Sequence, residues 1–191
     1  MNYTPSNKLT HILLTISFML VLGLSSAFAG AVVVDGTDAS DHGSTDGVAN
    51  FNGWLYMQKV LETLAANAPP GAAKVVVDIG TEPGTEARDA IDSAFSKSSL
   101  PAAGWTIVHV NGAVAVGAWM AALSTSNTGI LALPTHDETD GDMDDAEQAA
   151  INANAAALAN FVNNQGGALH AMVEESRPCL LHRRARRQSP S

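Results

Sequence analysis

Cysteine and basic residues are the residue types that this chain has least of. The single cysteine, Cys179, excludes a disulfide within the chain, so the stability of the fold must come from packing. Residues 30–175 contain all 19 acidic residues and only four basic ones, which gives this segment a net charge of −15. Because phosphate binding requires a basic face, this acidic body argues against nucleic acid as a partner.

The chain also lacks a long apolar run. Its most apolar stretch, residues 12–24, is shorter than the roughly 20 residues that a transmembrane helix needs. It follows Lys8 and precedes Ala27-Phe28-Ala29, and this basic start, apolar centre and A-x-A exit are typical of a secretory signal peptide. We therefore expect residues 1–29 to be cleaved, which leaves a secreted or periplasmic protein without a stable membrane span. An uncleaved N-terminal anchor is the alternative.

The last segment, residues 176–191, differs from the body in composition. It holds five arginines and no acidic residue. This pattern indicates either a basic interaction arm or a frameshifted end, because the chain stops soon after a strand that looks internal. In the second case the sheet is truncated at its C-terminus, and a parallel sheet without its final helix is expected to expose apolar surface.

The body, residues 30–175, alternates between two hydrophobic periodicities. Short β-branched or apolar runs bounded by turn residues predict strands at residues 31–35, 74–80, 105–110, 129–134 and 168–173. Helical spacing of apolar residues or a high alanine content predicts helices at residues 54–66, 85–95, part of 113–126, and 145–164. Strands that alternate with helices favour an α/β fold with a mostly parallel five-stranded sheet covered on both faces.

Polar residues follow each predicted strand, and the carboxyl ends of parallel strands are where α/β sheets bind ligands. We therefore take as ligand-binding candidates Asp35, Asp38, Asp41, His42, His109, His136, His170 and Glu174. A divalent cation is a possible cofactor there, with the metal-ligand candidates Asp41, His42, His136 and Asp137. The alternative is that these residues serve only as turn and helix-capping residues.

The segment from His136 to Glu147 partly fits the calcium-binding loop of an EF-hand. Acidic residues stand at positions 3, 5, 7, 9 and 12 and glycine at position 6, but position 1 is histidine and a strand precedes the loop. We favour the simpler interpretation that Asp142 or Asp144 caps the following helix.

The chain has no G-x-S-x-G turn, the motif that holds the nucleophilic serine in α/β-hydrolases. Three segments, residues 33–43, 130–134 and 161–170, resemble the class I glutamine amidotransferase-like superfamily, and within it the ThuA-like branch. The resemblance implies a flavodoxin-like three-layer sandwich. It does not imply amidotransferase activity, because the region after Val173 reads Glu-Glu-Ser without the nucleophilic cysteine. It suggests His42 and His170 as candidate binding residues.

Three functions follow as hypotheses. The first is an exported binding domain, non-catalytic or degenerate, that recognises a small molecule, a carbohydrate or a partner protein. The second is a metal-dependent hydrolase that uses the Asp and His cluster at the carboxyl ends of the strands. The third is a truncated product without function.

Overall fold

The computed structural model describes residues 29–36, 39–135 and 142–172. The predicted signal peptide and basic tail lie outside the described residues. So do four of the candidate site residues: Asp38, His136, Asp137 and Glu174. In the part of the chain that is described, none of the helices has the length and apolar character needed to cross a membrane.

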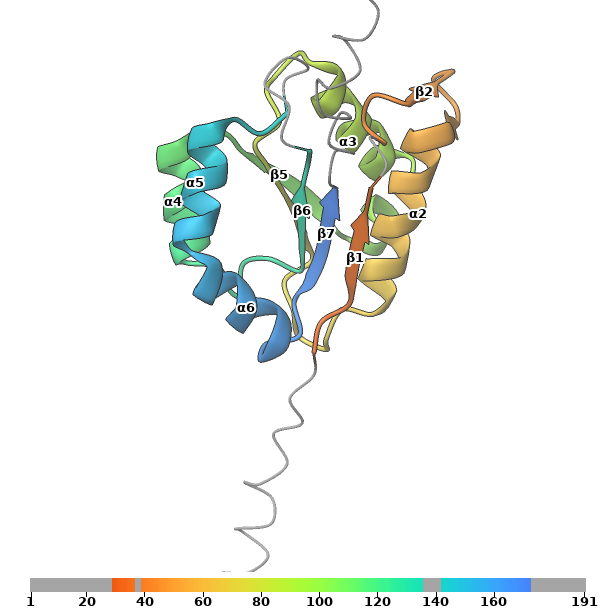
Figure 1. The fold of residues 1–191 in the computed structure, drawn as a ribbon. Helices are drawn as coiled ribbons and strands as arrows, with labels where there is room; N and C mark the ends of the chain where they lie inside the picture. Colours follow the sequence, from red (N-terminus) through yellow and green to blue (C-terminus); the bar gives the residue numbers. More distant parts are fainter. Residues whose placement is uncertain (1–28, 37–38, 136–141, 173–191) are drawn as a thin grey trace, which may run out of the picture.

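A five-stranded sheet forms the centre of the molecule, and all of its strands are parallel. In Figure 1 the arrows of β1 and β7 point upward, so the carboxyl edge of the sheet lies at the top. The strand that comes first in the sequence pairs with the one that comes last. The spatial order is β1 (Val32–Asp35), β7 (Ala168–Met172), β6 (Ile130–Leu133), β4 (Val75–Ile79) and β5 (Thr106–Val110).

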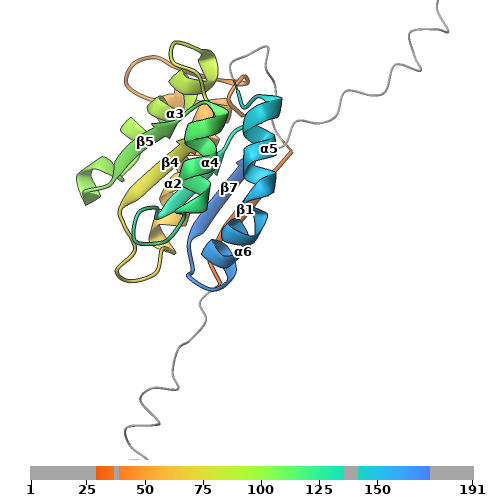
Figure 2. The same ribbon diagram turned by 90° about the vertical axis from the view of Figure 1, so that its left-hand side faces the viewer.

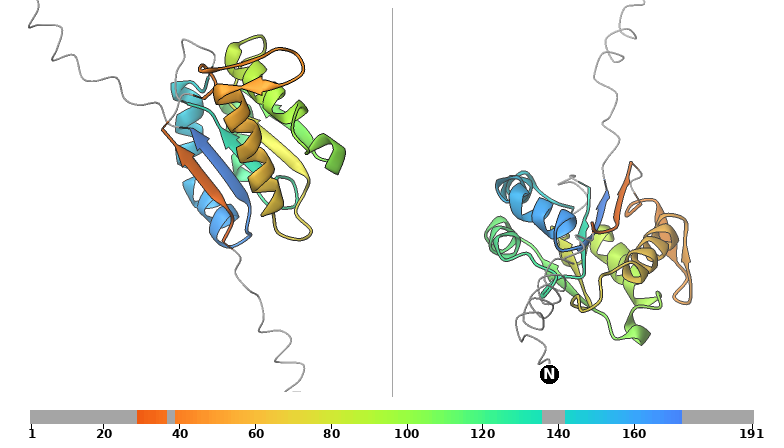
Figure 3. Two further views of the ribbon diagram at one scale, coloured as in Figure 1. Left: turned by 90° about the vertical axis from the view of Figure 1, so that its right-hand side faces the viewer. Right: turned by 90° about the horizontal axis from the view of Figure 1, so that it is seen from below.

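Helices cover both faces of the sheet, which gives three layers (Figure 1). One face carries α2 (Asn52–Ala66) and α3 (Glu86–Ser96), and the left panel of Figure 3 shows this face, with α2 beside β7. The other face, seen in Figure 2, carries α4 (Ala113–Ala121), α5 (Asp145–Ala153) and α6 (Ala155–Asn163). The fold is therefore the α/β flavodoxin-like three-layer sandwich that the sequence predicts.

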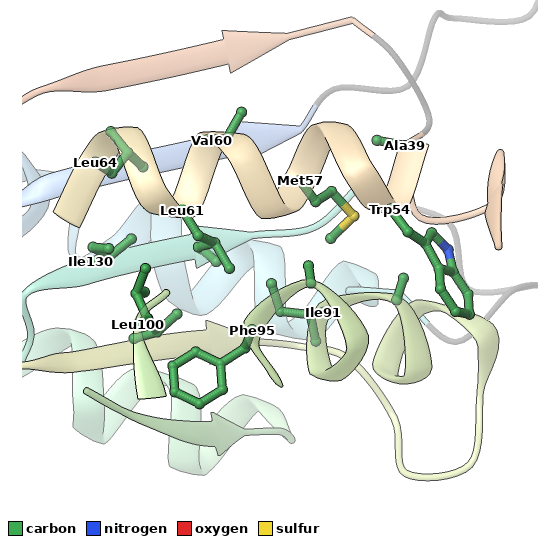
Figure 4. Packing of buried hydrophobic residues seen from close by; sticks show 14 of the residues in the cluster. Ala39, Trp54, Met57, Val60, Leu61, Leu64, Ile91, Phe95, Leu100 and Ile130 are labelled. Carbon is green, nitrogen blue, oxygen red and sulfur yellow. The ribbon is translucent and has the colours of Figure 1, made fainter. Parts of the chain in front are cut away.

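Each face has its own apolar core because side chains alternate between the two faces along every strand. On the α2 and α3 face, Met57, Leu61 and Leu64 of α2 pack with Ile91 of α3 and Ile130 of β6 (Figure 4). On the opposite face, the central strands contact buried side chains of α4, α5 and α6, namely Val116, Met120, Ile151, Phe161 and Val162. At the sheet edge the covering is thinner, and Val32 and Val34 of β1 are 46% and 64% exposed.

A short hairpin between β1 and α2 is an element that the sequence interpretation missed. Its strands, β2 (Gly43–Thr45) and β3 (Asn50–Phe51), are antiparallel and lie outside the main sheet. The turn is stabilised by Asp46, whose Oδ1 accepts hydrogen bonds from the backbone N–H of Val48 at 2.8 Å and of Ala49 at 2.7 Å. Gly47 takes a positive φ of 90°, which glycine adopts without strain. The Asp46-Gly47 pair favours a hairpin turn and could have indicated this hairpin from the sequence.

The helix expected over residues 145–164 is two helices. The break falls at Asn154, whose φ of −109° and ψ of 19° leave the helical region. Its side-chain amide donates to the backbone oxygen of Ala150 at 2.9 Å, so the asparagine caps the end of α5. Asparagine competes for backbone hydrogen bonds in this way, and the high alanine content of the segment concealed the effect.

Candidate functional site

The carboxyl edge of the sheet carries a hollow between the β2–β3 hairpin and the start of α3. Its volume is about 380 Å³. The hairpin lies over this edge because the chain turns back directly after β1, and α3 begins here because it follows β4 (Figure 1). The wall consists of small, hydroxyl-bearing and acidic residues with one indole ring: Gly43, Ser44, Thr45, Trp54, Gly84, Thr85, Glu86 and Asp89.

The α3 side of the hollow is acidic. Thr85 caps the helix, since its side-chain oxygen accepts from the backbone N–H of Arg88 at 3.4 Å. Glu86 and Asp89 lie in the first helical turn, where negative charge is favoured by the helix dipole. Both are exposed, and neither side chain forms a hydrogen bond or an ion pair within the described residues. Their carboxylates are therefore available to a ligand.

The hairpin side of the hollow is held by Trp54. Its indole Nε1 donates to the backbone oxygen of Ser40 at 2.7 Å, and the residue is 8% exposed. A Cβ added to Gly43 would lie 1.9 Å from this ring, so only glycine allows the hairpin to approach so closely. Trp54 thus has a structural role, and one edge of it lines the hollow.

A buried network lies beside the hollow and joins β4, β5 and α3. The carboxylate of Asp78 is 2% exposed, and its Oδ2 lies 2.9 Å from Nδ1 of His109, the residue opposite it on β5. The other ring nitrogen, Nε2, lies 3.0 Å from Oδ1 of Asp92 on α3. Thr81 also donates to Asp78. His109 therefore stands between a buried and a half-exposed carboxylate.

Arg88 extends this network to the loop that precedes α3. Its Nε donates to the hydroxyl of Thr81 at 2.8 Å, and its Nη2 donates to the backbone oxygen of the same residue at 2.5 Å. Its Nε also lies 3.6 Å from Oδ2 of Asp78, which places a positive charge beside the buried carboxylate. The guanidinium thus fixes the loop from β4 to α3, which includes the hollow residue Gly84.

A second histidine network lies under α2, at the carboxyl end of β1. His170 on β7 is fully buried, and its Nε2 lies 2.7 Å from Oδ2 of Asp35. The ring of Tyr56 packs edge-on against it, with 6.4 Å between ring centroids. Burial, the negative charge of Asp35 and a hydrogen bond to that carboxylate raise the pKa of Tyr56. Asp35 thus ties the edge strand to both β7 and α2.

The predicted candidates therefore fall into separate places. Asp35 and His170 contact each other at β1 and β7, whereas His109 belongs to a separate network on the same face of the sheet, at β4 and β5. Asp41 is half-buried and His42 is exposed in the turn before the hairpin, whereas His170 is fully buried. Among residues 29–36, 39–135 and 142–172, no three His, Cys, Asp or Glu side chains come together as a metal site would require. The metal prediction, which includes His136 and Asp137, stays a prediction.

The acidic run before α5 is confirmed as a capping segment at Asp144. This side chain accepts from the backbone N–H of Glu147 at 2.7 Å, and the carboxylate of Glu147 accepts in return from the backbone N–H of Asp144 at 3.0 Å. The second oxygen of Glu147 accepts from the backbone N–H of Gly112, which precedes α4. Glu147 is 2% exposed and joins the starts of two helices. Residues 136–141 of the EF-hand-like segment lie outside the described residues.

Sequence interpretation missed the residues that α3 contributes. Glu86, Asp89 and Asp92 recur every three residues on this helix, and Arg88 precedes Asp92 by four. Residues at these spacings share a helix face, so this acidic stripe was the available signal. The candidate residues were taken only from the positions directly after each strand, and these acidic residues lie within the following helix.

Comparison of the chain with protein-family models, with curated proteins and with solved structures gave no match. The resemblance to the glutamine amidotransferase-like superfamily therefore stays a prediction that rests on the residues quoted for it.

Proposed function

We propose that this protein is an exported, non-catalytic binding domain whose ligand occupies the hollow at the carboxyl edge of the sheet. The observation that carries the proposal is the lining of the hollow, where the free carboxylates of Glu86 and Asp89 face hydroxyl-bearing residues of the hairpin. Such acceptors suit a small ligand rich in hydrogen-bond donors, of the kind that a carbohydrate presents.

The state of the two described histidine networks supports binding rather than catalysis. His170 has no exposed surface, and both nitrogens of His109 already face carboxylates. A general base must reach the proton it removes, so neither imidazole is placed to act on a ligand in the hollow. This agrees with a degenerate relative of the glutamine amidotransferase-like proteins that lacks the nucleophilic cysteine.

The proposal can be tested by titrating ¹⁵N-labelled protein with a panel of mono- and oligosaccharides while recording amide chemical shifts. We expect a saccharide to shift the amides of residues 43–45 and 84–89 and to be recovered unchanged. Replacing Glu86→Gln and Asp89→Asn together should weaken binding at least tenfold, since a hydrogen bond to a charged group contributes about 1.5–3 kcal/mol.

Glu82→Gln is the matched control, because Glu82 is also exposed and acidic but does not line the hollow. This variant should bind as the unaltered protein does. Shifts that map to other residues, or equal losses in both sets of variants, would contradict the proposed site. Consumption of the saccharide would contradict a non-catalytic role.

A further inference from the structure

The β2–β3 hairpin, which forms one side of the hollow, has very little apolar surface buried in the fold. Among residues 43–51, all of which the structure describes, only Asn50 is buried, at 3% exposed. The larger apolar side chains of the hairpin, Val48 and Phe51, are 86% and 44% exposed. Because apolar burial is the main force that holds an element in a fold, the position of this hairpin must depend on other contacts.

Asn50 supplies these contacts as a polar anchor. Its side-chain amide donates to Oε1 of Gln58 on α2 at 3.2 Å and to the backbone oxygen of Ser93 on α3 at 3.0 Å. In return, its Oδ1 accepts from the hydroxyl of Ser93 at 2.6 Å. Gln58 is itself buried, and its amide donates to the backbone oxygen of Lys97 at 3.0 Å. One side chain of the hairpin is thereby joined to both helices on this face of the sheet.

The anchor lies across the hairpin from the residues that line the hollow. In the antiparallel pair of β2 and β3, Asn50 stands opposite Thr45, and Phe51 stands opposite Ser44. Ser44 and Thr45 line the hollow, whereas Asn50 does not. The hydrogen bonds of Asn50 therefore connect α3, which forms the other side of the hollow, to the hairpin that carries these lining residues. They set the separation of the two sides.

A further bond reaches the tip of the hairpin from Lys97, whose Nζ donates to the backbone oxygen of Gly47 at 3.2 Å. This bond is exposed, so water can replace it at little cost. The buried amide of Asn50 cannot exchange its partners for water, and a buried polar group without a partner is costly. The position of the hairpin therefore depends on Asn50 and much less on Lys97.

We propose that Asn50 is the positioning residue of the hollow: its buried hydrogen bonds hold the β2–β3 hairpin at a fixed separation from α3. A site whose sides are in place before the ligand arrives loses less freedom when it binds. The hairpin position follows from the contacts of Asn50, whereas the effect on a ligand rests on the proposed function.

The test measures the position of the hairpin in the protein without ligand. Spin labels are attached at Val48→Cys on the hairpin tip and at Ala102→Cys in the 3-10 turn that follows α3, in a Cys179→Ser background. Both labelled positions are exposed, so the labels disturb no packing. Double electron–electron resonance should give one narrow distance between the labels, because the hairpin is held in place.

Asn50→Asp keeps the size of the side chain but places a carboxylate oxygen against two acceptors. The narrow distance should be lost under conditions in which the protein stays folded, a change that lower stability of the whole fold would not produce. Ser93→Ala removes one of the three bonds and should broaden the distance less. This milder variant serves as the test if Asn50→Asp does not fold.

Lys97→Gln is the matched control, because it removes the exposed bond to the hairpin and leaves the buried ones. This variant should keep the narrow distance. An unchanged distance in both Asn50→Asp and Ser93→Ala, or equal broadening in Lys97→Gln, would show that the proposal is wrong. A saccharide ligand should bind Asn50→Asp more weakly, in proportion to the fraction of molecules with the hairpin in place. Failure to find such a ligand would leave the distances unchanged and would count only against the proposed function.

Discussion

The two histidine networks of this protein join the same kinds of groups in different surroundings. His170 and His109 each lie within hydrogen-bonding distance of a carboxylate on a neighbouring parallel strand, Asp35 and Asp78. Around His170 the third group is the aromatic ring of Tyr56, and the imidazole has no exposed surface. Around His109 the other groups are charged, and the side chain is 22% exposed.

This difference separates a fully enclosed pair from one that lies at a partly exposed, charged edge. An imidazole enclosed by apolar side chains loses its only polar partner if the strand moves, so the pair at His170 fixes β1 to β7. An imidazole at a charged edge can exchange a protein carboxylate for water at little cost, so the pair at His109 is expected to contribute less to stability. The following variants test this contrast, beginning with the largest expected effect.

His170→Ala should destabilise the protein by about 2–4 kcal/mol, because it opens a cavity in the core and leaves the 8% exposed carboxylate of Asp35 without its imidazole partner. Urea unfolding followed by tryptophan fluorescence measures the change. An effect below about 1 kcal/mol, the size typical of surface changes, would remove the structural role assigned to this pair.

His109→Ala should cost less, about 1–2 kcal/mol. Asp78 keeps a hydrogen bond from Thr81 and the nearby charge of Arg88, so its buried carboxylate is not left alone. The same unfolding experiment gives the value. If this variant were destabilised more than His170→Ala, the contrast between the enclosed network and the partly exposed one would be reversed.

Tyr56→Phe should lower the stability at neutral pH by about 1 kcal/mol, the usual value of one hydrogen bond. Because burial and the charge of Asp35 raise the pKa of Tyr56, the folded state favours the neutral phenol. That stabilisation is complete below the pKa of an unfolded tyrosine, about 10, and is lost as the pH rises through the higher pKa of the folded protein.

Stability above about pH 10 should therefore fall less steeply in Tyr56→Phe than in the unaltered protein. Tyr3, the other tyrosine of the chain, lies in the predicted signal peptide, so in protein that starts at residue 30 the ultraviolet absorbance reports the phenolate of Tyr56 alone. Ionisation at the pH of a free tyrosine would contradict the described contact with Asp35.

Asp92→Asn should change stability least, by about 0–1 kcal/mol at pH 7, because exposed ion pairs contribute little. A loss comparable to that of His109→Ala would mean that Asp92 contributes as much to the network as the histidine does.

Local sequence patterns were sufficient to predict the layers of the fold and the helix cap at Asp144. Apolar runs bounded by turn residues located all five strands of the sheet, including the edge strand β1, which is apolar in sequence although Val32 and Val34 are partly exposed. The acidic run ending at Asp144 indicated a helix start, because the bonds of a capping segment join residues three apart. The Asn154 break was missed because capping competes with the helix propensity of the surrounding alanines.

What the sequence by itself determined is the alternation of strands and helices, and with it an acidic edge where the strands end. Only the tertiary structure decided which polar residues meet there. His170 and Asp35 are 135 positions apart, and His109 and Asp78 are 31 apart. Such contacts depend on strand order and register, above all on β1 lying beside β7. Hydrophobic periodicity records which face a residue occupies, but it carries no information about its neighbour across the sheet.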